Sequence, residues 1–149
     1  MKIAVACDHG GFKLKKPLVE HLEGKGYEII DCGCNSENSC DYPDHALAAA
    51  EAVSKGEADY AMLICTTGIG MSMAANKVKG VRCALLHEAE SARLTRAHND
   101  ANALAMGSMI VSEEDMKKIV DVFLSTPFDG GRHLRRVDKI TAIENKYFK

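Results

Sequence analysis

The sequence predicts an α/β protein, a Rossmann-like αβα sandwich built on a five-stranded parallel sheet. Short apolar runs alternate with amphipathic stretches along the whole chain, which is the pattern of a parallel sheet covered by helices on both faces. The chain has 149 residues, a length that accommodates five strands with their helices and buries a core without disulfides or a structural metal. We therefore expect a single domain spanning residues 1–149.

The expected strands are compact and mostly apolar, as strands buried on both faces must be. In chain order they cover residues 2–7, 27–31, 60–65, 81–86 and a short run near 103–111.

Helical periodicity marks the segments between these strands. Leu14, Leu18 and Leu22 recur at four-residue spacing and predict the first helix, which Gly24 and Gly26 are placed to end. The following helices are expected at 44–54, with a proline in the first turn, at 71–77 and at 88–97.

The last two helices carry apolar stripes. Met116, Ile119 and Phe123 form one stripe, with Ser112 as the N-cap ahead of an acidic first turn. The other stripe lies in a helix from about 136 to 147. That C-terminal helix can pack on its own subunit or on a partner subunit, and the sequence leaves both options open.

Composition excludes several classes of protein. The formal net charge of −2, from 19 Lys and Arg against 21 Asp and Glu, provides no overall basic field for a nucleic acid or an anionic membrane surface. No run of about 18 apolar residues occurs, and the apolar start turns polar at Asp8, too early for a signal peptide. We expect a cytoplasmic protein.

Six cysteines are expected to be free thiols, because nothing indicates secretion. Cys32, Cys34 and Cys40 lack the paired spacing of a zinc site. We predict neither a metal nor a cofactor.

In an open parallel sheet, ligands bind beyond the carboxyl ends of the strands. The first expected strand is followed by Asp8, His9 and two glycines. Asp8 can cap the next helix or bind a ligand, and an isolated Asp-His pair does not decide between these roles.

The third expected strand ends in Cys65-Thr66-Thr67-Gly68-Ile69-Gly70. Its glycines expose backbone N–H groups at a helix start, which suits an anion. The segment is neither a P-loop nor a dinucleotide fingerprint, so no nucleotide is implied. Cys65 is either a reactive thiolate or the last buried residue of its strand.

Two further segments carry candidate chemistry. His98 precedes Asn99 and can serve as an acid or base, or as a helix C-cap. Arg132 and Arg136 lie four residues apart in a local basic cluster, so on a helix they share a face that suits one phosphate, although a solvated charge run is the alternative.

Together these segments resemble the family of ribose 5-phosphate isomerase B, which also contains the galactose 6-phosphate isomerase subunits. The resemblance runs nearly end to end. Its motifs are Cys7-Asp8-His9-Gly10-Gly11, Asp41-Tyr42-Pro43, the Cys65 segment through Ser72, Ala74-Ala75-Asn76-Lys77, His98-Asn99-Asp100-Ala101-Asn102 and Gly130-Gly131-Arg132-His133 with Arg136.

The resemblance implies a metal-free aldose–ketose isomerase that interconverts D-ribose 5-phosphate and D-ribulose 5-phosphate through a cis-enediolate, in the pentose phosphate pathway. It implies a homodimer or tetramer whose active site is shared between subunits. Cys65 would be the base, Thr67 would hydrogen-bond the reacting oxygens, and His98 would open the sugar ring. The implied substrate-binding residues are Asp8, His9, Tyr42, Thr66, Gly68, Ile69, Gly70, Asn99, Arg132 and Arg136.

Two alternatives stay open. The first is an isomerase of another sugar, such as allose 6-phosphate, galactose 6-phosphate or a free rare sugar, because Thr66 stands where the family usually has glycine. The second is a sugar-phosphate sensor that binds with the same loop and performs no chemistry.

Overall fold

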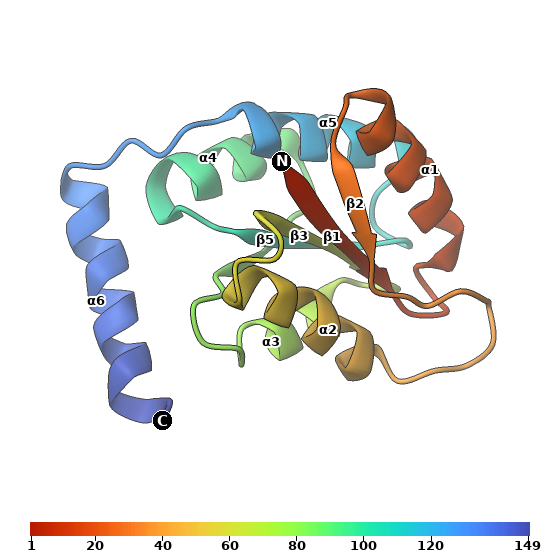
Figure 1. The fold of residues 1–149 in the computed structure, drawn as a ribbon. Coiled ribbons are helices and arrows are strands. Elements are labelled where there is room, and N and C mark those ends of the chain that lie inside the picture. Colours follow the sequence, from red (N-terminus) through yellow and green to blue (C-terminus); the bar gives the residue numbers. More distant parts are fainter.

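The five apolar runs of the sequence pair as parallel strands at the centre of an αβα sandwich (Figure 1). A computed structural model describes all 149 residues. The strand order is β2-β1-β3-β5-β4, with β1 (Lys2–Cys7), β2 (Glu28–Asp31), β3 (Tyr60–Cys65), β4 (Cys83–Leu85) and β5 (Ala103–Gly107). The predicted fold class is confirmed.

The helices cover both faces of the sheet. One face carries α1 (Phe12–Gly24), α4 (Ala89–Asn99) and α5 (Glu113–Ser125), and the other carries α2 (Tyr42–Ser54) and α3 (Ile69–Ala75). The last helix, α6 (Arg132–Tyr147), extends away from the sandwich beside α4 (Figure 1). No helix of the chain combines the length and apolarity that crossing a membrane requires.

The two faces of the sheet differ in the size of their side chains. Successive residues of a strand point to opposite faces, so β1 sends Ile3 and Val5 to one core and Ala4 and Ala6 to the other. The core with the larger side chains packs on α1 and α5, whereas the alanine core packs on α2, which is itself rich in alanine. Small residues on both surfaces let α2 approach the sheet closely.

Two strands are shorter than predicted, because residues at one end of each predicted strand form hydrogen bonds within local turns. β4 begins at Cys83 and not at residue 81, since the Val81 N–H donates to the Val78 carbonyl in a turn. β5 ends at Gly107, whose carbonyl accepts the N–H groups of Ile110 and Val111.

Three predicted helices begin or end elsewhere. α2 starts two residues earlier, at Tyr42. α3 starts at Ile69, directly after Gly68 turns the chain with a φ of 80°, and α4 continues to Asn99. The N-cap at Ser112 is confirmed, because its hydroxyl accepts the Asp115 N–H at 3.1 Å.

The C-terminal helix begins at Arg132 and not near residue 136. Gly130 and Gly131 adopt positive φ angles of 67° and 56°, and the turn that they make directs the chain into the helix at once. Arg132 and Arg136 are therefore both helical, as their proposed shared face requires.

Candidate active site

The centre of the sheet supplies the site at its carboxyl edge. The connection from β1 leads to β2 on one side of β1, and the later strands β3, β5 and β4 lie on its other side. The order in which strands are added to the sheet therefore reverses between β1 and β3, while all strands stay parallel. Such a switch point is where open parallel sheets bind ligands. The turns that follow Cys7 and Cys65 meet there, since Gly10 packs directly against the Thr66 hydroxyl and a side chain on Gly11 would collide with Ile64.

The loop after β3 wraps around the sulfur of Cys65. This thiol is 5% exposed, and the Gly68 N–H donates to its Sγ at 3.1 Å. Residue 68 must be a glycine for the loop to close in this way. Its φ is 80°, and a side chain there would collide with Leu85 and Met106. The next N–H group, that of Ile69, donates to the Thr67 hydroxyl at 3.3 Å.

Asp8 and His9 come from the neighbouring turn. Asp8 is 6% exposed and accepts the Gly11 N–H at 3.0 Å. The N-cap of α1 is Gly11 itself, so Asp8 lies just before the helix and is not its capping residue. His9 is exposed, and its Nδ1 faces the N–H of Cys40 at 3.3 Å. The other ring nitrogen of His9 has no partner within the chain, which leaves it available to a ligand.

Tyr42 borders the same loop from the first turn of α2. Its ring lies so close to Gly70 that a side chain there would approach Cε1 to 2.5 Å. Nine of the predicted residues therefore gather at this edge of the sheet: Asp8, His9, Tyr42, Cys65, Thr66, Thr67, Gly68, Ile69 and Gly70.

The other four predicted residues lie at the opposite end of the sheet, where the strands begin. Asn99 ends α4 before β5 begins, and its carbonyl accepts the Nε–H of Arg82, which precedes β4. Cys65 is paired instead with Gly107, the last residue of β5. Because a strand rises about 3.3 Å per residue, the two ends of β5, and so the two ends of the sheet, are separated by roughly 13 Å or more. Within one chain, His98, Asn99, Arg132 and Arg136 therefore do not meet Cys65. The end of α4 and the start of α6, which carry these four residues, lie together (Figure 1).

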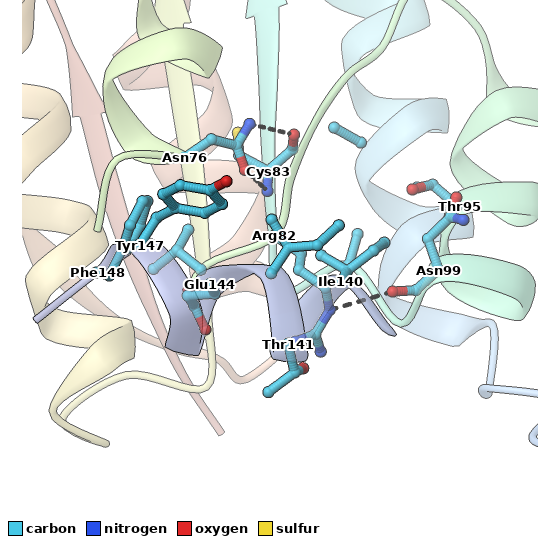
Figure 2. A pocket seen from close by; sticks show the side chains of 14 residues that line it. Asn76, Arg82, Cys83, Thr95, Asn99, Ile140, Thr141, Glu144, Tyr147 and Phe148 are labelled. Atoms are coloured by element: carbon cyan, nitrogen blue, oxygen red, sulfur yellow. Dashed lines mark hydrogen bonds between the residues drawn. The ribbon is translucent and has the colours of Figure 1, made fainter. Parts of the chain in front are cut away.

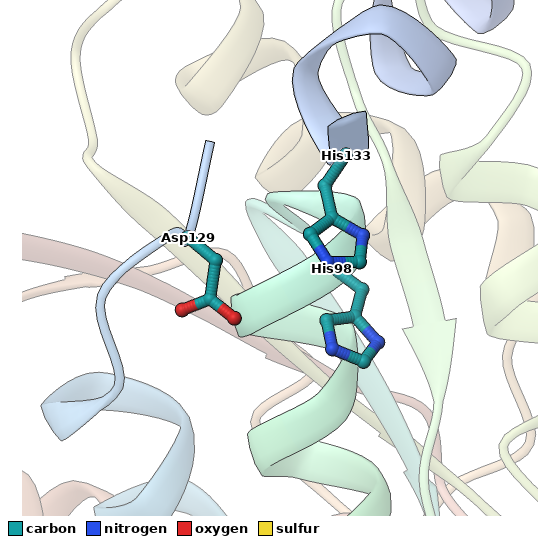
Figure 3. Close-up of side chains that lie close together, drawn as sticks. All are labelled: His98, Asp129 and His133. Carbon is teal, nitrogen blue, oxygen red and sulfur yellow. The ribbon is translucent and has the colours of Figure 1, made fainter. Parts of the chain in front are cut away.

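These four residues lie where the end of α4 meets the start of α6. The rings of His98 and His133 stack there with centroids 4.1 Å apart and planes 6° from parallel (Figure 3). Asp129 is held beside them by its N–H, which donates to the Ala97 carbonyl at 3.0 Å. Sequence reasoning assigned no role to His133 or Asp129, because their distance from His98 along the chain carries no periodic signal.

Positive charge surrounds the stacked rings. Burial, the neighbouring His98 and the guanidinium groups of Arg132 and Arg136 lower the pKa of His133, while Asp129 opposes them. The same arrangement of charges favours an anion with more than one negative charge, such as a phosphate.

His98, Asp129 and His133 also bring three potential metal ligands within 4.8 Å of one another. Their geometry does not converge on a tetrahedral centre, because the lone pairs of two stacked, nearly parallel rings point in parallel planes. A metal would therefore require one ring to turn out of the stack.

A cavity of about 580 Å³ lies between α6, α4 and β4, and Asn99 is among the residues that line it (Figure 2). Ile140, Ile143 and Tyr147 of α6 form much of its wall. Opposite them, the amide of Asn76 bonds both backbone groups of Cys83, at 2.8 and 2.9 Å. Burial raises the pKa of Cys83 to about 12, so this thiol is a poor nucleophile or base near neutral pH.

A thiol loop at the switch point of a parallel αβα sandwich, with a separate basic cluster, defines a class of α/β enzyme that acts on a small anionic substrate. A family model described as Ribose/Galactose Isomerase matches residues 3–140. The chain belongs to this family, as its motifs predicted.

Relatives cover almost the whole chain. It is 50% identical to ribose-5-phosphate isomerase B of Escherichia coli over 145 residues, 97% of each protein. It is 48% identical to a putative sugar phosphate isomerase of Bacillus subtilis over 147 residues, 98% of this chain and 99% of that protein.

Solved structures agree with the fold. Ribose-5-phosphate isomerase B of Clostridium thermocellum superposes with a TM-score of 0.97 at 49% identity, covering 99% of both chains. The enzyme of Mycoplasma genitalium with bound ribulose-5-phosphate superposes with a TM-score of 0.94 at 46% identity, covering 97% of both chains.

Proposed function

We propose that this protein is an aldose–ketose isomerase that interconverts D-ribose 5-phosphate and D-ribulose 5-phosphate. The observation that carries the proposal is the Cys65 loop at the switch point, in which the Gly68 N–H donates to the thiol and the Thr67 hydroxyl follows two residues after it. Relatives named as this enzyme share about half of the sequence over almost its full length, which supports the same substrate.

Cys65 is the proposed base. As a thiolate it takes the proton from one carbon of the substrate and returns it to the neighbouring carbon. The negative charge that develops on the substrate oxygens requires donors fixed in advance. The Thr67 hydroxyl and the N–H groups of residues 68–70 are proposed to supply them. The Gly68 N–H donates to the Cys65 Sγ and the Ile69 N–H to the Thr67 hydroxyl, so these two groups exchange their contacts within the loop for the substrate oxygen when it binds.

The remaining residues are proposed to open the sugar ring and to bind its hydroxyls and phosphate. His98 is proposed to open the furanose ring by proton transfer, with Asp8 and Asn99 holding sugar hydroxyls. His9, Arg132 and Arg136 are proposed to bind the phosphate, and this remote binding energy orients the reacting carbons.

These roles require two subunits. Cys65 and His98 lie at opposite edges of the sheet in one chain, so a shared site forms only if the α4–α6 end of one subunit meets the Cys65 edge of another. We propose a homodimer, alone or as half of a tetramer. The exposed apolar residues Leu134, Ile140 and Ile143 of α6 support such contact.

We place this activity in the cytoplasm. A phosphorylated sugar carries charge that does not cross a bilayer readily, so its enzyme is expected in the compartment that retains it.

Thr66 bears on the choice of sugar. Its hydroxyl side packs against Gly10, so this side chain joins the two turns of the site and does not block the sulfur. The geometry therefore accommodates threonine at this position.

The first experiment follows ketose formation by the purified, chelator-treated protein from ribose 5-phosphate and, in parallel, allose 6-phosphate. We expect faster turnover of ribose 5-phosphate and its loss in Cys65→Ala. Cys83→Ala is the matched control, because Cys83 pairs with Ala103 at the start of β5, whereas Cys65 pairs with Gly107 at its end. Unchanged turnover in Cys65→Ala would refute the proposed base, and binding without turnover would favour the sensor.

A further inference from the structure

A buried arginine lies near the end of α4, and the proposed reaction does not use it. The Arg96 side chain is 8% exposed, and its guanidinium carbon lies 5.1 Å from the centre of the Tyr60 ring and 5.6 Å from that of the Phe123 ring. The buried Nε of Arg96 has no hydrogen-bond partner. Because a buried charge costs free energy unless it is paired, the partner of this guanidinium is the first thing to identify.

Asp100 supplies the pairing charge. The Nη1 of Arg96 donates to the Asp100 carboxylate at 2.8 Å and to the Ala101 carbonyl at 2.7 Å. Asp100 follows α4 directly and has a φ of 48°, the only positive φ of the chain outside glycine. A left-handed residue after a helix redirects the backbone. Arg96 therefore binds the turn at the point where the chain leaves α4.

A second arginine binds the same turn. Arg82 precedes β4, and its Nε donates to the carbonyls of Asn99 and Asp100 at 3.2 and 3.1 Å. Its Nη2 donates to the Asp100 carbonyl at 2.8 Å. Carbonyl groups at the end of a helix lack partners within it, and Arg82 satisfies that of Asn99. Charged hydrogen bonds of this kind are stronger than neutral ones, so two guanidinium groups fix the turn.

The last turn of α4 carries side chains of the candidate site. His98 and Asn99 directly precede Asp100, and the His98 ring stacks on that of His133 with centroids 4.1 Å apart. Because one helical turn carries His98 and Asn99, a change in its backbone displaces both together. A displacement of about 1 Å from a productive geometry can cost on the order of a hundredfold in rate.

Stability alone does not require an arginine at position 96. An apolar side chain of similar length would pack against the same aromatic rings, Tyr60 and Phe123. Replacing a buried ion pair by apolar groups is often neutral or stabilising. What an apolar side chain cannot do is hold the Asp100 carboxylate and the Ala101 carbonyl at the end of the helix.

We propose that Arg96 is a positioning residue, which fixes His98 and Asn99 in their working orientation by holding Asp100. The catalytic consequence rests on the proposed function, in which His98 opens the sugar ring. The orientation of His98 does not depend on that function and can be measured separately.

Arg96→Met separates positioning from stability. Methionine packs well on aromatic rings, and Asp100 keeps its contacts with Arg82. In steady-state assays we expect kcat for ribose 5-phosphate to fall about ten- to a hundredfold. KM should change little, because Arg132 and Arg136 of the proposed phosphate site lie on α6. The urea midpoint should equal or exceed that of the wild type.

Two further variants test the cause. Arg93→Met is the matched control, because Arg93 lies on the same helix and pairs with Glu90 at the surface, and its kcat should equal that of the wild type. Arg96→Lys keeps a positive donor but loses the planar guanidinium, so its kcat should lie between those of Arg96→Met and the wild type. An unchanged kcat in Arg96→Met would overturn the proposal.

NMR follows the orientation of His98 without turnover. Stacked rings shift each other's proton resonances, so the imidazole signals of His98 and His133 report their contact. Both sets should move in Arg96→Met and stay in place in Arg93→Met. Unmoved signals in Arg96→Met would overturn the proposal even if kcat and the urea midpoint both fell. Moved signals in a protein whose wild type does not isomerise ribose 5-phosphate would refute the proposed function and support the positioning of His98 by Arg96.

Discussion

The imidazole rings of His98 and His133 stack face to face at 4.1 Å, and through this contact the last turn of α4 holds the first turn of α6. The start of α6 also carries Arg132 and Arg136. The stack therefore couples the orientation of the proposed ring-opening group to the position of the proposed phosphate-binding arginines.

Removing the His133 ring should impair the proposed function of His98 while leaving the His98 side chain itself unchanged. We expect His133→Ala to lower kcat/KM for ribose 5-phosphate by about ten- to a hundredfold, because a displaced catalytic group loses its alignment with the substrate. His133→Phe keeps a flat ring and should recover much of kcat in steady-state assays. If Phe is as impaired as Ala, the imidazole of His133 acts directly and stacking is not its role.

The charge state of His133 should depend on its basic neighbours. Burial, His98, Arg132 and Arg136 lower its pKa from the ordinary 6.5, with Asp129 opposing. In a titration followed by NMR, His133 should protonate at lower pH than a free histidine, and Arg132→Ala should bring its pKa back toward 6.5. An unchanged pKa in Arg132→Ala would contradict the assigned cause.

The same shift has a consequence for stability. Because the folded protein binds this proton less readily than the unfolded chain, the stabilising contribution is complete above pH 6.5 and is lost as pH falls toward the lowered pKa. In urea unfolding, His133→Gln should therefore lose less stability between pH 7.5 and pH 5 than the wild type. An identical pH dependence in both proteins would oppose this prediction.

Gly68 should tolerate no side chain. Gly68→Ala places a Cβ against Leu85 and Met106 at a φ of 80°, and we expect a loss of about 2–5 kcal/mol of unfolding free energy from left-handed strain and overpacking together. Gly56→Ala is the matched control, because its φ is 75° and nothing lies within 4 Å. It should lose only the strain, about 1–2 kcal/mol. Equal losses in denaturant unfolding would show that crowding at Gly68 is unimportant.

A shared site predicts rescue between inactive subunits. Cys65→Ala and His98→Ala proteins should each be inactive, and a hybrid dimer should contain one intact site. Random exchange between equal amounts should restore about a quarter of wild-type activity, as two-fold symmetry requires. Exchange must be verified with a mass tag on one variant. No recovery after verified exchange would show that the site does not combine residues from two chains.

The fold and one half of the candidate site were predictable from local patterns. Cys65 follows an apolar run and precedes two glycines, and this sequence alone indicates a loop at the carboxyl edge of the sheet. The start of α6 was misplaced, because Arg132 follows two glycines that are typical of a loop. Their positive φ angles make the turn into the helix, and no local pattern distinguishes that from an open loop.

Sequence by itself determined the strands, the parallel sheet and the candidate chemistry, because alternating hydrophobicity is a property of neighbouring residues. Tertiary structure decided which of these side chains contact one another. The stacking of His98 on His133, the contact between the sulfur atoms of Cys7 and Cys34, and the distance between Cys65 and His98 depend on how helices and loops far apart in the chain pack on one sheet. That packing is set by the shapes of buried surfaces, which no short stretch of sequence contains.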